Sequence, residues 1–214
     1  MLKVICCGLA TKYLATQIAK LAYSHRMLIE KLEILADAFE SKGVNVRSNL
    51  APGATDSELE LVAEQYGVEL PDDYRTLYKW HNGNADLNAR NVFKFRDNAF
   101  LSIKDFRNAK FTIDIYAEPS PITDGVIDLS TALPLALFEG AVYVTPGKGA
   151  GISTLSPQPV VSVFQGIDVF FLSIETMVDT CIAWVAQPDW KQFSTAPNEH
   201  QLWAQHNPGV FDRF

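Results

Sequence analysis

The segment from Thr55 to Gly83 most constrains the fold, because its residues specify two short helices joined by a tight corner. Thr55 and Glu58 have the spacing of a capping box, in which the two residues satisfy each other's backbone N–H groups at a helix start. Gly67 is placed to end this first helix, since glycine adopts the left-handed conformation at low cost. Pro71 suits the start of a second helix, where its missing N–H breaks no hydrogen bond. The residues that define this pattern are Thr55, Glu58, Gly67, Leu70, Pro71, Asn82 and Gly83.

The second helix carries most of the residues that we consider for partner binding. Its apolar face is expected to extend to His81 before Asn82-Gly83 turns the chain. Trp80 lies beside this turn and has two interpretations: an exposed aromatic anchor for a partner, or a buried side chain that closes the helix against a sheet. Asp72 and Asp73 favour the positive end of the helix dipole, which by itself accounts for them. The candidate partner-binding residues are Asp72, Asp73, Trp80, His81 and Glu139.

Residues 1–48 are predicted to be helical and to form an N-terminal extension. A first helix is expected over Ala10–Leu21, and a second from Ser24 to about Lys42, where Gly43 stops it. The second helix presents one apolar face: Leu28, Leu32, Leu35 and Phe39. We favour packing of this face on the main domain, because a helix with one apolar stripe usually buries it internally. The alternative is a helix pair that binds a partner or dimerises.

After Gly83 the apolar pattern changes to short runs and alternation, which predict strands. Strands are expected at residues 92–95, 111–115, 135–138, 141–145, 160–164 and 169–172. Residues 119–125 are expected to form a loop, and residues 146–151 a glycine-rich hairpin connection. Ser173 is placed to cap a final amphipathic helix, and a short helix is expected at Glu199–Gln205 within the tail.

This order of helices, then strands, then a helix predicts an α+β fold with a central, mostly antiparallel sheet and helices packed against it. We divide the chain into an N-terminal helical extension (1–48), a main domain (49–186) and a C-terminal tail packed on that domain (187–214). The 214 residues suit one domain with added terminal pieces.

The charge of the chain argues for a basic partner and against nucleic acid. Eighteen Lys and Arg residues against 25 Asp and Glu residues give a formal charge of −7, whereas nucleic-acid binding depends on basic clusters. The simpler interpretation is that acidity keeps the protein soluble. The three cysteines, Cys6, Cys7 and Cys181, match no zinc pattern, and reduced thiols indicate a cytoplasmic protein. We expect no export signal and no membrane span.

The sequence contains no motif for catalysis. Gly147-Lys148-Gly149-Ala150-Gly151 is too short for a phosphate loop and is followed by a predicted strand. The four histidines have no metal-ligand spacing. Cys181 lies on the apolar face of a helix, where cysteine behaves as a small hydrophobe. We therefore predict no catalytic residue, no cofactor site and no metal site.

The ordered series from residue 52 to 83 resembles the front of the SUKH superfamily, which includes the Smi/Knr proteins. The series is Pro52-Gly53-Ala54-Thr55, Glu58, Gly67-Val68-Glu69-Leu70-Pro71-Asp72-Asp73-Tyr74, Leu77-Tyr78 and His81-Asn82-Gly83. The resemblance continues more weakly to about residue 186, while residues 1–48 and the tail lie outside it. It implies an α+β fold with a central sheet and no known catalysis.

Two functions follow from the resemblance. Bacterial members are commonly immunity proteins that bind and neutralise secreted toxins, often nucleases, which predicts a basic toxin domain as the protein partner here. Fungal members act as interaction hubs in cell-wall regulation, which makes a regulatory scaffold the alternative. The oligomeric state stays open.

Overall fold

A computed structural model describes residues 26–86, 99–106, 109, 113, 121–122, 125–127, 129–138, 141–148, 151–153, 156, 158–163, 167–188, 190 and 199–210. The helices are an N-terminal helix described over residues 26–41, α2 (Asp56–Tyr66), α3 (Asp72–Trp80), α5 (Ile174–Val185) and α6 (Glu199–His206). Residues 106, 109 and 113 are also helical. Short 3-10 turns cover Arg47–Asn49, Ile103–Asp105 and Leu129–Thr131. No helix in these ranges combines the length and apolarity needed to cross a membrane.

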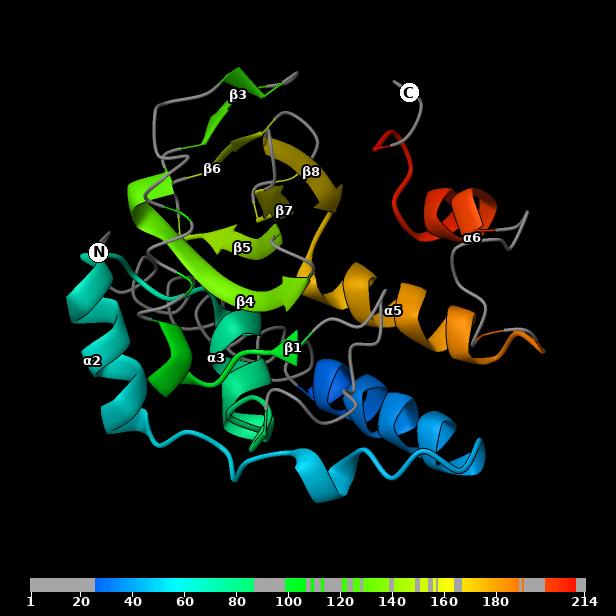
Figure 1. Cartoon of the computed structure of the whole chain (residues 1–214). Coiled ribbons are helices and arrows are strands. Elements are labelled where there is room, and N and C mark those ends of the chain that lie inside the picture. The colour runs from blue at the N-terminus through cyan, green and yellow to red at the C-terminus, as the bar shows by residue number, and fades with distance from the viewer. Residues whose placement is uncertain are drawn as a thin grey trace, which may run out of the picture.

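The strands form two antiparallel sheets, which confirms the α+β prediction (Figure 1). The larger sheet has the order β1-β4-β5-β7-β8 and the smaller one the order β2-β3-β6. In Figure 1, α3, α5 and the N-terminal helix lie below the larger sheet and the smaller sheet lies above it. The strands are β1 (Ala99–Phe100), β2 (Pro121–Ile122), β3 (Gly125–Ile127), β4 (Ala132–Phe138), β5 (Ala141–Pro146), β6 (Gly151–Ser153), β7 (Val160–Val163) and β8 (Ile167–Phe171).

The strands predicted at 135–138 and 141–145 form the hairpin β4–β5, and those predicted at 160–164 and 169–172 form the hairpin β7–β8. β4 begins three residues before the predicted start. The predicted connection after Pro146 is not a hairpin, because β6 pairs with β3 of the smaller sheet and not with β5. The chain therefore passes from the larger sheet to the smaller sheet between β5 and β6, because β6 pairs with β3. The predicted loop 119–125 contains β2. The predicted strand 92–95 lies outside the described residues.

The predicted strand at 111–115 is wrong at its described residue, because Ile113 is helical. Phe106, Ala109 and Ile113 are all buried, and their spacing of three and four residues is that of one helix face. The alternation of apolar residues at 111–115 therefore misled the prediction, because the burial of the described residues follows the helical period.

The described part of the N-terminal helix buries its apolar face in the same core as the sheet. Leu28, Leu32, Leu35 and Phe39 are at most 1% exposed and belong to the main hydrophobic cluster. The ring of Phe39 makes edge contacts with the rings of Trp184 and Trp190, 6.5 and 5.7 Å between centroids. This apolar face is therefore not available to a partner.

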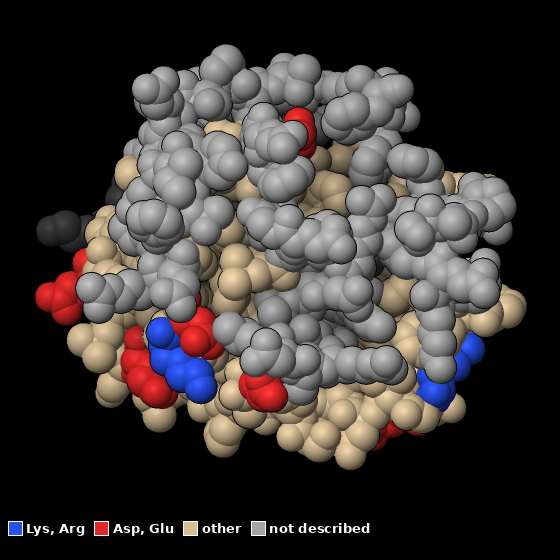
Figure 2. All heavy atoms as spheres, in the orientation of Figure 1, with Lys and Arg blue, Asp and Glu red and all other residues tan. Residues whose placement is uncertain are grey.

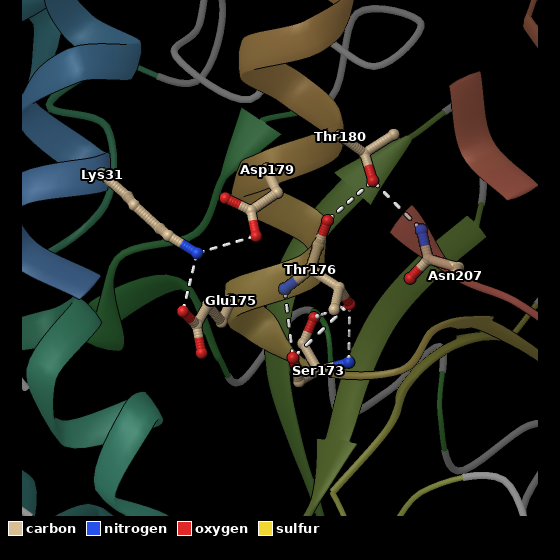
Figure 3. Close-up of polar contacts among 7 residues, drawn as sticks. All are labelled: Lys31, Ser173, Glu175, Thr176, Asp179, Thr180 and Asn207. Carbon is tan, nitrogen blue, oxygen red and sulfur yellow. Dashed lines mark hydrogen bonds and ion pairs between the residues drawn. The ribbon is translucent and has the colours of Figure 1, made fainter. Parts of the chain in front are cut away.

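Ion pairs between the N-terminal helix and α5 add to this packing. The Lys31 ammonium lies 2.7 Å from Glu175 and 2.8 Å from Asp179 on α5 (Figure 3). Partial burial lowers the pKa of Lys31, but the hydrogen bonds to the two carboxylates outweigh it and leave the pKa raised. The ammonium thus stays charged and joins the N-terminal helix to α5.

Candidate protein-binding surface

The Thr55–Gly83 segment has the predicted caps, with its second helix shifted by one residue. The Thr55 hydroxyl accepts a hydrogen bond from the Glu58 N–H, and the Glu58 carboxylate accepts one from the Thr55 N–H at 2.7 Å. Gly67 ends α2 with a positive φ of 64°. Pro71 is the N-cap of α3 and not its first residue, and the helix stops at Trp80. His81 is extended, so it does not continue the apolar helix face.

The turn before α2 is hydrogen bonded to the end of α3, which holds the two ends of the Thr55–Gly83 segment together. The Ala54 N–H donates to the Tyr78 carbonyl at 2.8 Å, and the Ala51 N–H donates to the Gly83 carbonyl at 2.9 Å. A Cβ atom at Gly53 would lie 2.0 Å from the carbonyl oxygen of Lys79. Only glycine allows this close approach of two backbones.

Two tyrosines fasten α3 to the sheet. The hydroxyls of Tyr74 and Tyr78 each lie 3.1 Å from the carbonyl oxygen of Pro134, where β4 has a bulge in its pairing with β5. The Tyr78 hydroxyl is also 3.1 Å from the Leu101 carbonyl oxygen. Burial raises the pKa of both phenols well above its usual value, so both remain protonated donors.

The corner between α2 and α3 is held by the turn after β5. The Lys148 N–H donates to the Glu69 carbonyl at 2.8 Å, and the Lys148 ammonium lies 2.6 Å from the Glu69 carboxylate. A Cβ atom at Gly147 would lie 2.6 Å from Cβ of Val68. These contacts account for the Gly147-Lys148 part of the glycine-rich stretch without a phosphate. Glu69, and then Asp72, raise the pKa of Lys148.

Trp80 is half-buried and is engaged within the molecule. Its indole N–H donates to the Glu33 carboxylate at 2.6 Å, and the Arg47 guanidinium donates to the same carboxylate at 2.6 Å. These hydrogen bonds, from Arg47 first and then Trp80, lower the pKa of Glu33. His81 is also engaged, since its Nδ1 lies 2.7 Å from the Ala51 carbonyl oxygen. Trp80 is thus neither a fully exposed anchor nor a fully buried side chain, and the helix end that it joins is linked to the N-terminal helix through Glu33.

The structure does not bring the candidate partner-binding residues into one patch. Asp72 and Asp73 lie at the start of α3, whereas Trp80 and His81 lie at and just past its end. Asp72 and Trp80 are the first and last residues of α3, and the eight residue steps between them span roughly 12 Å along the axis, at 1.5 Å per residue. Glu139 lies outside the described residues.

The surface that the structure does bring together is the outer face of α2 with the adjoining corner, which the site prediction missed apart from Asp72 and Asp73. Residues 48–74 contain seven acidic side chains and no Lys or Arg. The seven are Asp56, Glu58, Glu60, Glu64, Glu69, Asp72 and Asp73. Figure 2 shows acidic side chains with a few basic ones over the part of the surface that α2 and α3 occupy in Figure 1. The uneven spacing of Lys and Arg along the chain was the signal available in the sequence.

This surface, which we call the α2 acidic face (Asp56–Asp73), is only partly neutralised. Asp56 pairs with Lys79, Glu60 with Arg75 and Glu69 with Lys148. Among the described residues, Glu64 has no ion-pair partner. Leu61 is 64% exposed in the middle of the face, one helical turn from Glu58 and Glu64. The face therefore offers one apolar side chain surrounded by carboxylates.

The described residues offer little for catalysis. They contain no group of three or more His, Cys, Asp or Glu side chains that could hold a metal ion. Burial raises the pKa of the Cys181 thiol well above its usual value, which makes it a poor nucleophile.

Part of the chain matches a known protein family. Residues 53–145 match the model of the SMI1 / KNR4 family (SUKH-1). This range begins at Gly53, includes α2 and α3, and ends in β5. The N-terminal helix, α5 and α6 lie outside it. No curated protein matches the chain.

Proposed function

Residues 53–145 place this chain in the SUKH superfamily, and from that premise we propose that it is a non-enzymatic protein-binding module that acts as an immunity protein. In this role it neutralises a toxin by binding it directly. The partner is a basic toxin domain, such as a nuclease, and the site of action is the cytoplasm, where a nuclease finds its substrate. No direct contact with nucleic acid is required.

The observation that carries this proposal is the α2 acidic face. A nuclease needs a basic cleft to hold its substrate, because phosphate contacts supply much of nucleic-acid affinity. Residues 48–74 carry seven carboxylates and no basic side chain. Three of these carboxylates pair with Lys79, Arg75 and Lys148, and the negative charge that remains is complementary to such a cleft. Complementary charge accelerates encounter and disfavours wrong partners. An inhibitor that must capture a toxin before it acts benefits from a fast association rate.

The exposed side chain of Leu61 supplies an apolar contact, which a purely charged surface lacks. Protein interfaces combine an apolar centre, from which water is excluded, with a polar rim. Leu61 lies between the carboxylates of Glu58 and Glu64 on successive turns of α2. We assign it to the centre of the interface and the carboxylates to the rim.

The scaffold alternative draws on the extra N-terminal helices. The apolar face of the described helix is buried against α5 and the core, so that face is not free to recruit an endogenous partner. This observation favours the immunity role over the scaffold role.

The test is to co-express this protein with candidate toxins encoded in reading frames next to its gene. Cells that express the toxin should survive when this protein is co-expressed, and the purified pair should form a complex. Protection should saturate at about one protein per toxin, because a binder acts stoichiometrically, whereas an enzyme would protect at much lower ratios. Cells that die despite a folded, expressed protein would rule out the immunity role. Recovery of only endogenous regulators would support the scaffold.

A further inference from the structure

The Asn82-Gly83 turn after α3 requires both of its residues for structural reasons. Gly83 has a φ of 73°, and a Cβ atom at this position would lie 2.2 Å from the Ser102 backbone nitrogen. No residue with a side chain fits there. The Asn82 side-chain oxygen accepts a hydrogen bond from the Ile103 N–H at 2.9 Å, which ties the turn to the segment after β1. The fold thus retains an Asn-Gly dipeptide at this position.

An Asn-Gly dipeptide is prone to one chemical change, which is loss of the side-chain amide. The Gly83 backbone nitrogen can attack Cγ of Asn82, because glycine has no side chain to obstruct the approach. A bond forms between this nitrogen and Cγ, the bond between Cγ and Nδ2 breaks, and the amide leaves as ammonia with the proton from the Gly83 N–H. Water then opens the resulting succinimide ring. Addition at Cγ gives aspartate, and addition at the backbone carbonyl of residue 82 gives isoaspartate, in which Cβ belongs to the main chain.

The folded structure restrains both residues against this reaction. Ring closure requires the Asn82 side chain and the peptide plane of Gly83 to rotate towards each other. The hydrogen bond from the Ile103 N–H holds the side chain. The Asn82 N–H donates to the Pro52 carbonyl at 3.3 Å, and the Gly83 carbonyl accepts from the Ala51 N–H at 2.9 Å. Gly83 is also buried. The turn must therefore open before the ring can close.

We propose that Asn82 is a site of spontaneous deamidation that is blocked in the folded protein and becomes reactive when the turn opens. Native proteins open locally and globally, so a small reactive population is always present. The modified fraction therefore grows with the time that the chain spends open. This inference is independent of the proposed function.

The two products should differ in whether they can refold. Aspartate keeps an acceptor for the Ile103 N–H. Isoaspartate lengthens the main chain by one C–C bond, about 1.5 Å. This extra length falls just before Gly83, where a Cβ atom would already lie 2.4 Å from the carbonyl carbon of Leu101. The isoaspartate chain should therefore not recover the native turn.

The experiment follows full-length protein at mildly alkaline pH, with and without denaturing guanidinium chloride. Peptide mass spectrometry measures the mass increase at residue 82. Deamidation of the folded protein should be slower by roughly tenfold or more, because only the open population reacts. Asn82→Gln, whose longer side chain closes a less favourable ring, is the control that assigns the mass increase. Equal rates in folded and unfolded protein would overturn the proposal, as would an Asn82 that stays unmodified in denaturant.

A second substitution tests the hydrogen bond that protects the turn. Ile103 begins a 3-10 turn and Ser102 before it is extended, so proline is compatible with position 103. Ile103→Pro removes the N–H that Asn82 accepts and should speed deamidation without denaturant by roughly fivefold. Ile103→Ala keeps that N–H and is the control for lost packing, and equal rates for the two variants would contradict protection by this contact. If the proline variant does not fold, the folded and unfolded natural protein still decide the proposal.

Refolding tests the fate of the products. After denaturant is removed, isoaspartate chains should stay in the fraction that does not refold. Asn82→Asp reproduces the other product and should fold. Isoaspartate chains that refold together with the unmodified protein would show that the turn tolerates the longer main chain, and would overturn the predicted irreversibility.

Discussion

The indole nitrogen of Trp80 lies 2.6 Å from a carboxylate oxygen of Glu33, and this contact joins the end of α3 to the N-terminal helix. The two residues are 47 positions apart in the chain. Glu33 lies outside residues 53–145, the range of the family match, whereas Trp80 lies within it. A residue that the family segment presents near its surface is thus engaged by a helix from outside that segment.

We expect Trp80→Phe to lower the free energy of unfolding by about 1 kcal/mol, because it removes a hydrogen bond to a partly exposed carboxylate. Arg47 still satisfies Glu33, which keeps the loss moderate. Urea denaturation measures it. The matched control is Glu30→Gln on the same helix, which removes only the exposed ion pair with Arg26 and should change stability very little. Equal midpoints for Trp80→Phe and the natural sequence would contradict this assignment.

The Glu33 contacts should also make stability depend on pH. The folded-state pKa of Glu33 is lowered, so the unfolded chain binds the proton more readily and stability rises with pH. This contribution is present above the ordinary pKa of 4.5 and is lost as the pH falls below it. The stability difference between the natural sequence and Glu33→Gln should therefore shrink between neutral pH and about pH 3. A difference that stays constant over this range, measured by urea titration, would refute the prediction.

Tyr74 and Tyr78 share the Pro134 carbonyl, which predicts non-additive substitutions. Tyr74→Phe or Tyr78→Phe alone should cost about 1 kcal/mol, because the other hydroxyl still donates to that oxygen. The double variant should cost more than the sum of the two, since a buried carbonyl then loses both tyrosine donors. A double-mutant cycle in denaturant measures the coupling. Simple additivity would mean that the two hydroxyls do not share one acceptor.

Substitution by alanine should lower the free energy of unfolding more at Gly53 than at Gly67. Gly53→Ala forces the Lys79 carbonyl to move, and we expect a loss of about 3 kcal/mol. Gly67→Ala is the matched control, because nothing lies within 4 Å of its Cβ position and only the positive φ opposes the substitution. That penalty is about 1–2 kcal/mol. Thermal or urea unfolding of the two variants decides the order, and a larger loss for Gly67→Ala would contradict the close approach at Gly53.

Charge reversal on the α2 acidic face should weaken binding of the toxin. Glu64→Lys is expected to slow association, with affinity reduced by about tenfold at low salt and less at high salt. Leu61→Ala should act mainly on the dissociation rate, because it removes apolar contact at the centre. Glu30→Lys makes the same change in net charge on the N-terminal helix and is the control. Surface plasmon resonance at two salt concentrations separates these effects, and equal losses for Glu30→Lys and Glu64→Lys would place the interface elsewhere.

Only part of the α2 acidic face could be predicted from the sequence. Lys and Arg are absent between Arg47 and Arg75, so the acidic stretch could be read from the chain. The folded structure was needed to show that Leu61 is exposed among these carboxylates. It was also needed to show which carboxylates pair with cations from distant parts of the chain, because the pattern of a short helix does not contain that information. Lys148, for example, reaches Glu69 across 79 residues.

The sequence by itself determined the local features of this protein. These features depend on hydrogen bonds between residues close in the chain, so residue type and spacing specify them. They are the Thr55–Glu58 box, the turn at Gly67, the Ser173 cap and the hairpins β4–β5 and β7–β8. The tertiary structure decided which surfaces are covered. Contacts between distant segments decide three features. They hold the Trp80 indole against Glu33, pair β6 with the smaller sheet, and supply the Trp203 N–H that the Phe170 carbonyl of β8 accepts. Such contacts are selected by the total burial and hydrogen bonding of the fold, and no local spacing encodes them.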